Sequence, residues 1–269
     1  MSREHMGRPR AETAFLIALV KSQLAASFAL RAAFWLSAAF MLLNNFLFFS
    51  TWWILMERFG HVRGWQLADV MCLFAVAASG FGLCVISCGG LPDLSRKVDD
   101  GELDAFLTQP KSVLLQALAS RTQASGWGDL ATGVALLVLS DAVSLSNLPW
   151  VVVAVLCSFV TFTACGVLMH SLAFWLGRTH ALSRALWEFT LTFSLYPSAL
   201  FGSGLKVVLF TLMPAGLVSY LPVELLRRPS LSALLACVLG TAAYASFALW
   251  IFSRGLRRYA SGNRFSVKA

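Results

Sequence analysis

The side chains with the greatest chemical potential in this sequence lie in one short polar segment, Pro92–Lys111, which holds five acidic and three basic residues. The stretches on either side of it are almost free of charge. No Walker-A, H-E-x-x-H or G-x-S-x-G pattern occurs in the chain, and no carboxylate pair lies within an apolar stretch. These absences disfavour ATP hydrolysis or intramembrane catalysis by this chain, so we expect the segment to meet a partner at a membrane face.

The polar segment has the pattern of a turn followed by a short amphipathic helix. Gly101 supplies the turn, and Pro110 ends the helix. Acidic side chains stand in the first turn, where the helix dipole favours them, and apolar side chains form a stripe. The candidate docking residues are Asp99, Gly101, Glu102, Leu103, Asp104, Phe106 and Leu107. The pattern fits a helix that docks into a groove of a cytoplasmic partner, and it equally fits a solvated loop held at the membrane by its apolar residues.

A second group of polar side chains interrupts the apolar stretches. Asp129 is a functional candidate because ionisable groups at membrane depth are costly, although it lies close enough to a polar end to snorkel. For His170, which has no acidic or cysteine companion nearby, we expect an interhelical hydrogen bond. Five residues are candidates to line a pathway for amphipathic drugs, lipids or organic cations, and they could equally well serve only to pack the helices together. These residues are Asn44, Asn45, Phe48, Trp52 and Asp129.

The composition indicates an all-α integral membrane protein that positions these groups on transmembrane helices. Hydrophobic residues make up 58% of the 269-residue chain, charged residues make up 13%, and the mean hydropathy is +0.73. The apolar stretches are continuous, which favours helices over a β-barrel. We predict six spans, at 33–56, 67–91, 124–140, 150–176, 185–204 and 231–252. The six cysteines lie inside apolar stretches without a ligand pattern, so we expect buried thiols and no metal site.

The remaining segments complete a predicted single transmembrane domain over 1–269. Residues 1–32 have the helical spacing and interrupting charges of an interfacial helix, and 205–220 is a re-entrant segment among prolines and glycines. The polar region 92–111 and the basic tail 253–269 lie on the same side as the N-terminus. Most of the 21 basic residues fall on that side, so both termini are predicted to be cytoplasmic. The excess positive charge is therefore attributed to topology and lipid contact, and no nucleic acid partner is expected.

Several motifs in order resemble one family of membrane proteins. GHVRGWQLADV, GGLPDL, GELDAFLTQPK and SGWGDL follow one another, and YPSALFGSGLKVVLFTLMPAGLVSYLPVELL precedes the last span. This arrangement, from about Trp53 to Arg254, resembles the permease subunits of the ABC-2 exporter superfamily, specifically its six-span family.

The resemblance implies a transmembrane subunit of the bacterial cytoplasmic membrane that pairs with a second permease and two copies of a separate ABC ATPase. ATP and magnesium would be bound by that ATPase, so no cofactor is expected on this chain. The coupling helix would be Asp99–Leu107, the N-terminal helix would brace the ATPase, and the segment at 205–220 would lie on the outer side. The alternative is a non-transport anchoring or assembly protein that recruits a cytoplasmic partner through the same polar segment.

Overall fold

The computed structural model describes residues 28–109, 111–140 and 146–259, together with residues 18, 21–23, 25 and 144. Within these residues the fold is helical, and one isolated β-bridge joins Val62 to Trp65. The long helices are α2 (Arg31–Phe59), α3 (Leu67–Ser87), α8 (Leu148–His170) and α13 (Leu231–Arg258). The helices of intermediate length are α7 (Ser125–Leu139), α10 (His180–Ser194) and α11 (Ser203–Thr211). The short helices are α4 (Leu94–Asp99), α5 (Asp104–Leu107), α6 (Val113–Leu118), α9 (Ala173–Leu176) and α12 (Leu221–Arg227).

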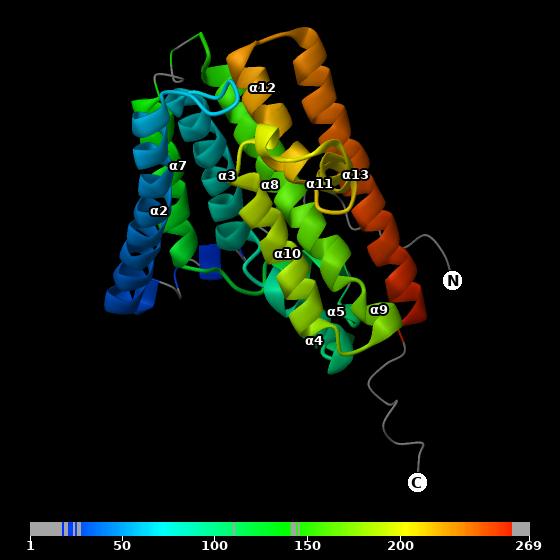
Figure 1. Cartoon of the computed structure of the whole chain (residues 1–269). Coiled ribbons are helices and arrows are strands. Elements are labelled where there is room, and N and C mark those ends of the chain that lie inside the picture. Colours follow the sequence, from blue (N-terminus) through cyan, green and yellow to red (C-terminus); the bar gives the residue numbers. More distant parts are fainter. Residues whose placement is uncertain are drawn as a thin grey trace.

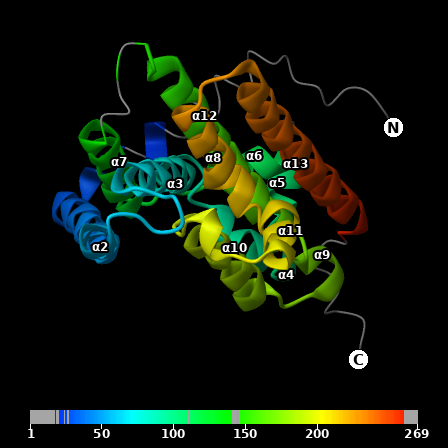
Figure 2. The ribbon, with the colours of Figure 1, turned by 45° about the horizontal axis from the view of Figure 1, so that its top comes forward.

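Helix α3 lies at the centre of the bundle. It packs between α7 and α8, while α2 covers α7, and α10 and α13 cover α8 (Figures 1 and 2). The apolar window of α3 is 78% buried, whereas those of α2 and α13 are each only 22% buried. The two outer helices therefore leave most of their apolar surface for lipid or for another protein.

Local sequence explains where the long helices begin. Gln66 and Asp69 form a reciprocal capping box at the start of α3, and the Ser230 hydroxyl accepts a hydrogen bond from the Ala233 amide at the start of α13. Pro149 stands in the first turn of α8, where its missing N–H leaves no intrahelical bond unmade. Helix α2 ends at Gly60, whose φ of 69° favours glycine.

The helices agree with the predicted all-α membrane architecture. Four of them, α2, α3, α8 and α13, are long and apolar enough to cross a membrane. Residues 203–211 and 216–227 form a pair of helices bent by 82°, as in a broken span or a re-entrant loop, where 205–220 was predicted to re-enter. A π-helical turn at Gly216–Tyr220 leads into α12. The predicted interfacial helix at 1–32 and the end of the predicted tail at 253–269 lie mostly outside the described residues.

Two predicted spans correspond to short helices. Helices α7 and α10 have 15 residues each, about 22 Å of rise, against a hydrocarbon thickness of about 30 Å. The segment predicted to span at 185–204 begins five residues earlier, at His180, and its helix ends at Ser194. Pro197 explains this end, because the residue before a proline is driven out of the α-helical region.

Candidate functional site

The polar segment forms α4 and α5, and together with α6 and α9 it makes a compact extension at one end of the bundle. We call this end the charged end, and it lies at the bottom of Figure 1. Its attachment to the bundle is apolar: Leu91, Leu94 and Leu103 are fully buried, and all three belong to a core shared with α8 and α13. Gly90 touches the backbone of α6 and donates a 2.9 Å hydrogen bond to the Leu118 carbonyl. The extension is therefore held as part of the bundle.

Ion pairs and one glycine turn shape the outer surface of the extension. Asp93 pairs with Arg121 at 3.3 Å and with Arg96 at 3.4 Å, and Arg96 also reaches Glu102 at 3.6 Å. Gly101 has a φ of 79°, so the chain reverses there between α4 and α5, as the predicted turn requires. Within Asp99–Leu107, the end of α4 is followed by the turn at Gly101 and then by the short helix α5, in the predicted order of turn and helix.

The apolar residues of the predicted stripe have different environments. Leu103 is fully buried, Phe106 is half-buried, and Leu107 is 47% exposed. Asp99 and Asp104 are half-buried, whereas Asp100 and Glu102 are exposed. The extension consequently presents Asp100, Glu102 and Leu107 outward, and it uses Leu103 for its own attachment.

Lys97 is a buried cation within the extension. Its Nζ donates to the Ser120 hydroxyl at 2.6 Å and to the Ala117 carbonyl at 3.4 Å, and it lies 5.4 Å from the centre of the Phe106 ring. Burial lowers the pKa of Lys97, and the nearby Asp93 and Glu102 carboxylates offset part of that effect. The fold therefore tolerates the ammonium group at some cost in stability.

We expect Lys97→Met to raise the melting temperature of the detergent-solubilised protein at pH 7 by about 1–3 °C. The folded-state pKa of Lys97 lies below its ordinary value of 10.5, so the charge opposes folding at neutral pH, and this penalty fades as the pH rises towards 10.5. The difference between variant and wild type should therefore narrow between pH 7 and pH 10. Lys206→Met on α11 controls for loss of a lysine, and a pH-independent difference at Lys97 would contradict the prediction.

A buried serine links the extension to the ends of α8 and α10. Ser95 in α4 lies 2.9 Å from His170 Nδ1 at the end of α8 and 3.2 Å from His180 Nδ1 at the start of α10. Ser95 and His170 are fully buried, and His170 Nε2 has no hydrogen-bond partner among the described residues. A hydroxyl can accept from one imidazole and donate to the other, so Ser95 satisfies both rings at once. We call these three residues the Ser95 hub.

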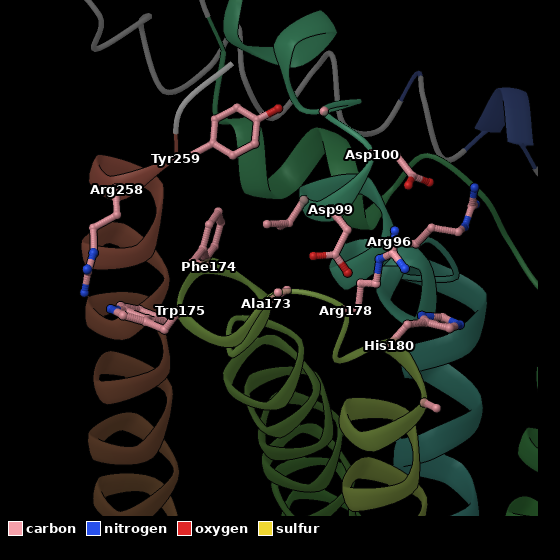
Figure 3. Close-up of a pocket in the computed structure, with 14 residues that line it drawn as sticks. Arg96, Asp99, Asp100, Ala173, Phe174, Trp175, Arg178, His180, Arg258 and Tyr259 are labelled. Atoms are coloured by element: carbon pink, nitrogen blue, oxygen red, sulfur yellow. The ribbon is translucent and has the colours of Figure 1, made fainter. Parts of the chain in front are cut away.

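A cavity of about 890 Å³ opens beside the extension. Its walls come from α4, the Asp100–Gly101 turn, α9, the loop before α10 and the end of α13 (Figure 3). The Asp99 carboxylate points into it near Ala173 and Arg178, and His180 of the hub lies on the same wall as Arg178. The charged lining residues are Arg96, Asp99, Asp100, Arg178 and Arg258.

The charges around the cavity act on its titratable groups. Burial and the adjacent Asp100 raise the pKa of Asp99, and Arg178 and His180 partly offset this. Burial and the Asp104 carboxylate raise the pKa of Tyr259 to about 12. Tyr259 follows the last residue of α13, and its ring packs against the apolar core that contains Leu103 of the extension and Phe252 of α13. Helices α8, α10 and α13 thus all contact the extension.

The predicted pathway residues fall into two environments. Asn45 donates a 2.7 Å hydrogen bond to Asp129 Oδ1 and lies 3.5 Å from the Thr132 hydroxyl, in the packed interface of α2 and α7. Asn44, its neighbour in sequence, is exposed on the outer surface of α2. The role of all these residues in substrate transfer stays a prediction.

The aromatic members of that predicted pathway lie on the side of α2 that faces the end of α10. The ring of Phe48 lies 5.7 Å from that of Phe74 and 6.1 Å from that of Tyr196. Trp52 is buried, with its ring 5.6 Å from that of Tyr196. These contacts join α2 to α3 and to the segment after α10.

Sequence reasoning found the polar segment but missed the groups that connect it to the bundle. His170 does make the predicted interhelical hydrogen bond, and its partner is Ser95. His180, Lys97 and Tyr259 were not singled out, because nothing in the sequence around them marks a partner that lies far along the chain. Arg184 and Glu188, four residues apart on α10, form an ion pair at 2.7 Å. All six cysteines are free, and no cluster of three metal-ligating side chains occurs in the described part of the chain.

Comparison with known families identifies the fold. The sequence model of the family described as ABC-2 family transporter protein matches residues 39–262 of the chain. This range includes all the helices from α3 to α13 and most of α2. The chain belongs to the ABC-2 transporter family. The resemblance predicted from the ordered motifs is thereby confirmed. No curated protein and no solved structure matched the chain.

Membership gives the helical bundle a general role. An ABC-2 chain is a multi-pass membrane permease, and components of this family associate in general with an ABC ATPase. The family match ends at residue 262 and therefore includes the whole charged extension and the Ser95 hub.

Proposed function

We propose that this ABC-2 permease is the membrane subunit of an exporter and that the α4–α5 extension couples it to a separate ATPase. The observation that carries the proposal is the construction of the extension. Its inner face is anchored by fully buried leucines, and its outer face presents Asp100, Glu102 and Leu107. The Ser95 hub joins it to α8 and α10, and apolar packing around Tyr259 joins it to α13. An element that is exposed outward and rigidly linked inward is suited to transmit movement from a bound partner.

The proposed topology has six spans, formed by α2, α3, α7, α8, α10 and α13. The charged end lies in the cytoplasm together with both termini, in a bacterial cytoplasmic membrane. The bent pair α11–α12 then re-enters from the outer side. The ion pair between Asp69 and Arg227, at 2.9 Å, supports this arrangement because it ties α12 to the outer end of α3.

The proposed complex contains a second permease and two ATPase copies, which bind ATP and magnesium. ATP binding closes the ATPases, and the extension carries that movement to α8, α10 and α13. The substrate crosses between the permeases, along the exposed side of α2 that includes Asn44 and Phe48. Asn45 and Asp129 hold α2 on α7 at the edge of this pathway.

We expect the double variant Asp100→Lys/Glu102→Lys to lose at least tenfold in recovery of the ATPase that co-purifies with the solubilised permease. Both acids are exposed, and like charges brought together across an interface cost several kcal/mol. Glu224→Lys is the matched control, because Glu224 is an exposed acid of α12 at the opposite end of the bundle. Thermal stability should change little in either variant.

Equal ATPase recovery in the double variant and the control would contradict the assignment of the docking surface. If ATPase is recovered but inverted vesicles show no ATP-dependent uptake of a lipophilic cationic dye or a fluorescent phospholipid, these two substrate classes fail. If the wild-type chain never recovers an ATPase, the exporter proposal fails and an anchoring role takes its place.

A further inference from the structure

A groove runs between α6 and the end of α13, at the charged end of the bundle. Its volume is about 440 Å³. Its apolar lining comes from both helices and consists of Val113, Leu114, Leu249, Phe252 and Leu256. The residues from α13 are spaced by three and four positions, so they lie along one face of that helix. The groove therefore offers apolar walls to an elongated ligand.

Two polar groups in the groove can donate hydrogen bonds to an anion. Arg257 is exposed and forms no ion pair with any other described residue. The Ser112 hydroxyl accepts from the Leu115 amide at 3.4 Å, which leaves its own proton for a ligand. Ser253 also borders the groove, but its hydroxyl donates to the Leu249 carbonyl of its own helix. None of the described residues that line the groove is acidic, so it favours a negatively charged group.

The order of side chains along α13 matches the depth profile of a phospholipid. Leu249 lies about 12 Å before Arg257 along the helix. Between them, Trp250 is 52% exposed, and the Arg254 guanidinium lies 5.2 Å from the centre of its ring. Exposed tryptophan and arginine side chains at the end of a span are typical of the boundary between hydrocarbon and headgroups. Leu249 therefore lies at hydrocarbon depth and Arg257 at headgroup depth.

The large cavity on the next face of α13 does not offer the same chemistry. Arg257 and Arg258 are adjacent and point about 100° apart around the helix, and each lines a different hollow. In the cavity of about 890 Å³, an anion beside Arg258 would also meet the Asp99 and Asp100 carboxylates. Because like charges repel, the groove at Arg257 is the better site for an anion.

We infer that the groove between α6 and α13 binds one anionic phospholipid. Its phosphate meets Arg257 and Ser112, and an acyl chain lies along Leu249 and Phe252. Arginine pairs with phosphate through charge-assisted hydrogen bonds, and basic pockets between membrane helices bind anionic headgroups. Because α6 belongs to the extension, the lipid contacts both the extension and the last span.

This lipid is a resident ligand rather than the transported substrate. Helices α13 and α2 lie at opposite edges of the bundle (Figures 1 and 2), so the groove is remote from the pathway proposed along α2. The inference goes beyond the proposed function and rests on it only to name the cytoplasmic leaflet as the source of the lipid.

Native mass spectrometry of the detergent-solubilised protein tests the inference with dioleoylphosphatidylglycerol and dioleoylphosphatidylcholine. Phosphatidylglycerol should bind more tightly than phosphatidylcholine, whose choline cation would lie near the arginines of α13. Arg257→Gln should weaken phosphatidylglycerol binding about fivefold, which corresponds to about 1 kcal/mol for a basic residue at an anionic membrane surface. Arg257→Lys, which keeps the charge, should bind nearly as well as wild type.

Arg254→Gln is the matched control, because it removes an arginine one turn away that does not line the groove. Equal loss of binding in Arg254→Gln and Arg257→Gln, or equal affinity of the wild type for both lipids, would overturn the inference. Inorganic phosphate in excess should leave the lipid bound, and full displacement would overturn the inference by assigning the site to a free anion.

Photo-cross-linking in liposomes made from equal parts of the two lipids identifies the occupant of the groove. Leu249→p-benzoylphenylalanine, at an exposed position in the lining, should label phosphatidylglycerol in preference to phosphatidylcholine. Leu239→p-benzoylphenylalanine, at an exposed position of α13 away from the groove, should label both lipids equally. A cross-link to protein at position 249, or the same lipid ratio at both positions, would overturn the inference. Neither assay contains the ATPase, so their failure would leave the docking result for Asp100 and Glu102 intact, and failure of that result would not affect them.

Discussion

Gly82→Val should prevent stable assembly of the bundle, with loss of most of the monodisperse protein in detergent. A β-carbon at Gly82 would lie 2.7 Å from the Gly126 carbonyl oxygen and 2.8 Å from the Leu130 nitrogen, both in the backbone of α7. Backbone atoms cannot rotate away, so α3 and α7 would have to separate. Overpacking of a close interface costs about 1–3 kcal/mol for a small addition, and the branched side chain of valine is a larger one.

Size-exclusion chromatography after a temperature ramp measures this effect. Gly82→Ala should lower the melting temperature by several degrees, and Gly82→Val should lower it further. Gly204→Ala is the matched control, because no atom lies within 4 Å of a β-carbon built there and α11 tolerates alanine. Equal melting temperatures for Gly82→Val and the control would show that the contact between α3 and α7 is not limiting.

The small residues around Gly82 illustrate what the sequence could predict. Their position within an apolar stretch indicates close helix contacts, and the structure places Gly82 against α7 and Gly80 against Ser158 of α8. The pattern does not name the partner helix, because glycine permits close approach on whichever side a neighbour happens to lie. Composition and periodicity therefore predicted the helices, while the pairing of helices required the folded chain.

The polar residues show the same limit. Asn44 and Asn45 are identical in type and adjacent in sequence, yet a rotation of about 100° buries one against Asp129 and exposes the other. Nothing in the local pattern distinguishes them, since the residues around both are apolar. The helices α7 and α10 were predicted only in part, for a similar reason. Apolar content indicates a helix, but Pro197 and the neighbouring helices decide where α10 ends.

The Ser95 hub could not be predicted from the sequence, because His170 and His180 lie 75 and 85 residues after Ser95 in the chain. Ser95 lies in a charged segment, where a serine is common and indicates no particular partner, and His180 lies in a basic turn. Their convergence depends on α4 folding back against the ends of α8 and α10. The hub that links α4 to α8 and α10 is thus a product of tertiary structure.

We expect Ser95→Ala to uncouple the ATPase from transport while ATPase binding is retained. The variant leaves the Nδ1 atoms of His170 and His180 without the bond that joins them, at a cost of about 1–3 kcal/mol for buried polar groups left unpaired. The docking residues Asp100 and Glu102 are unchanged, so the partner should still bind. With the hub broken, movement of α4 is passed less efficiently to α8 and α10.

Two measurements separate this effect from simple instability. In proteoliposomes of the complete complex, the ratio of transported substrate to ATP hydrolysed should fall at least fivefold, whereas recovery of the ATPase stays at the wild-type level. Ser253→Ala is the matched control, because the Ser253 hydroxyl bonds only the Leu249 carbonyl of its own helix and the side chain is exposed. Ser95→Thr, which keeps the hydroxyl, should restore part of the ratio if the added methyl is accommodated. A Ser95→Ala complex with a wild-type ratio would mean that the extension communicates with the membrane helices through Tyr259 and the leucine anchors instead.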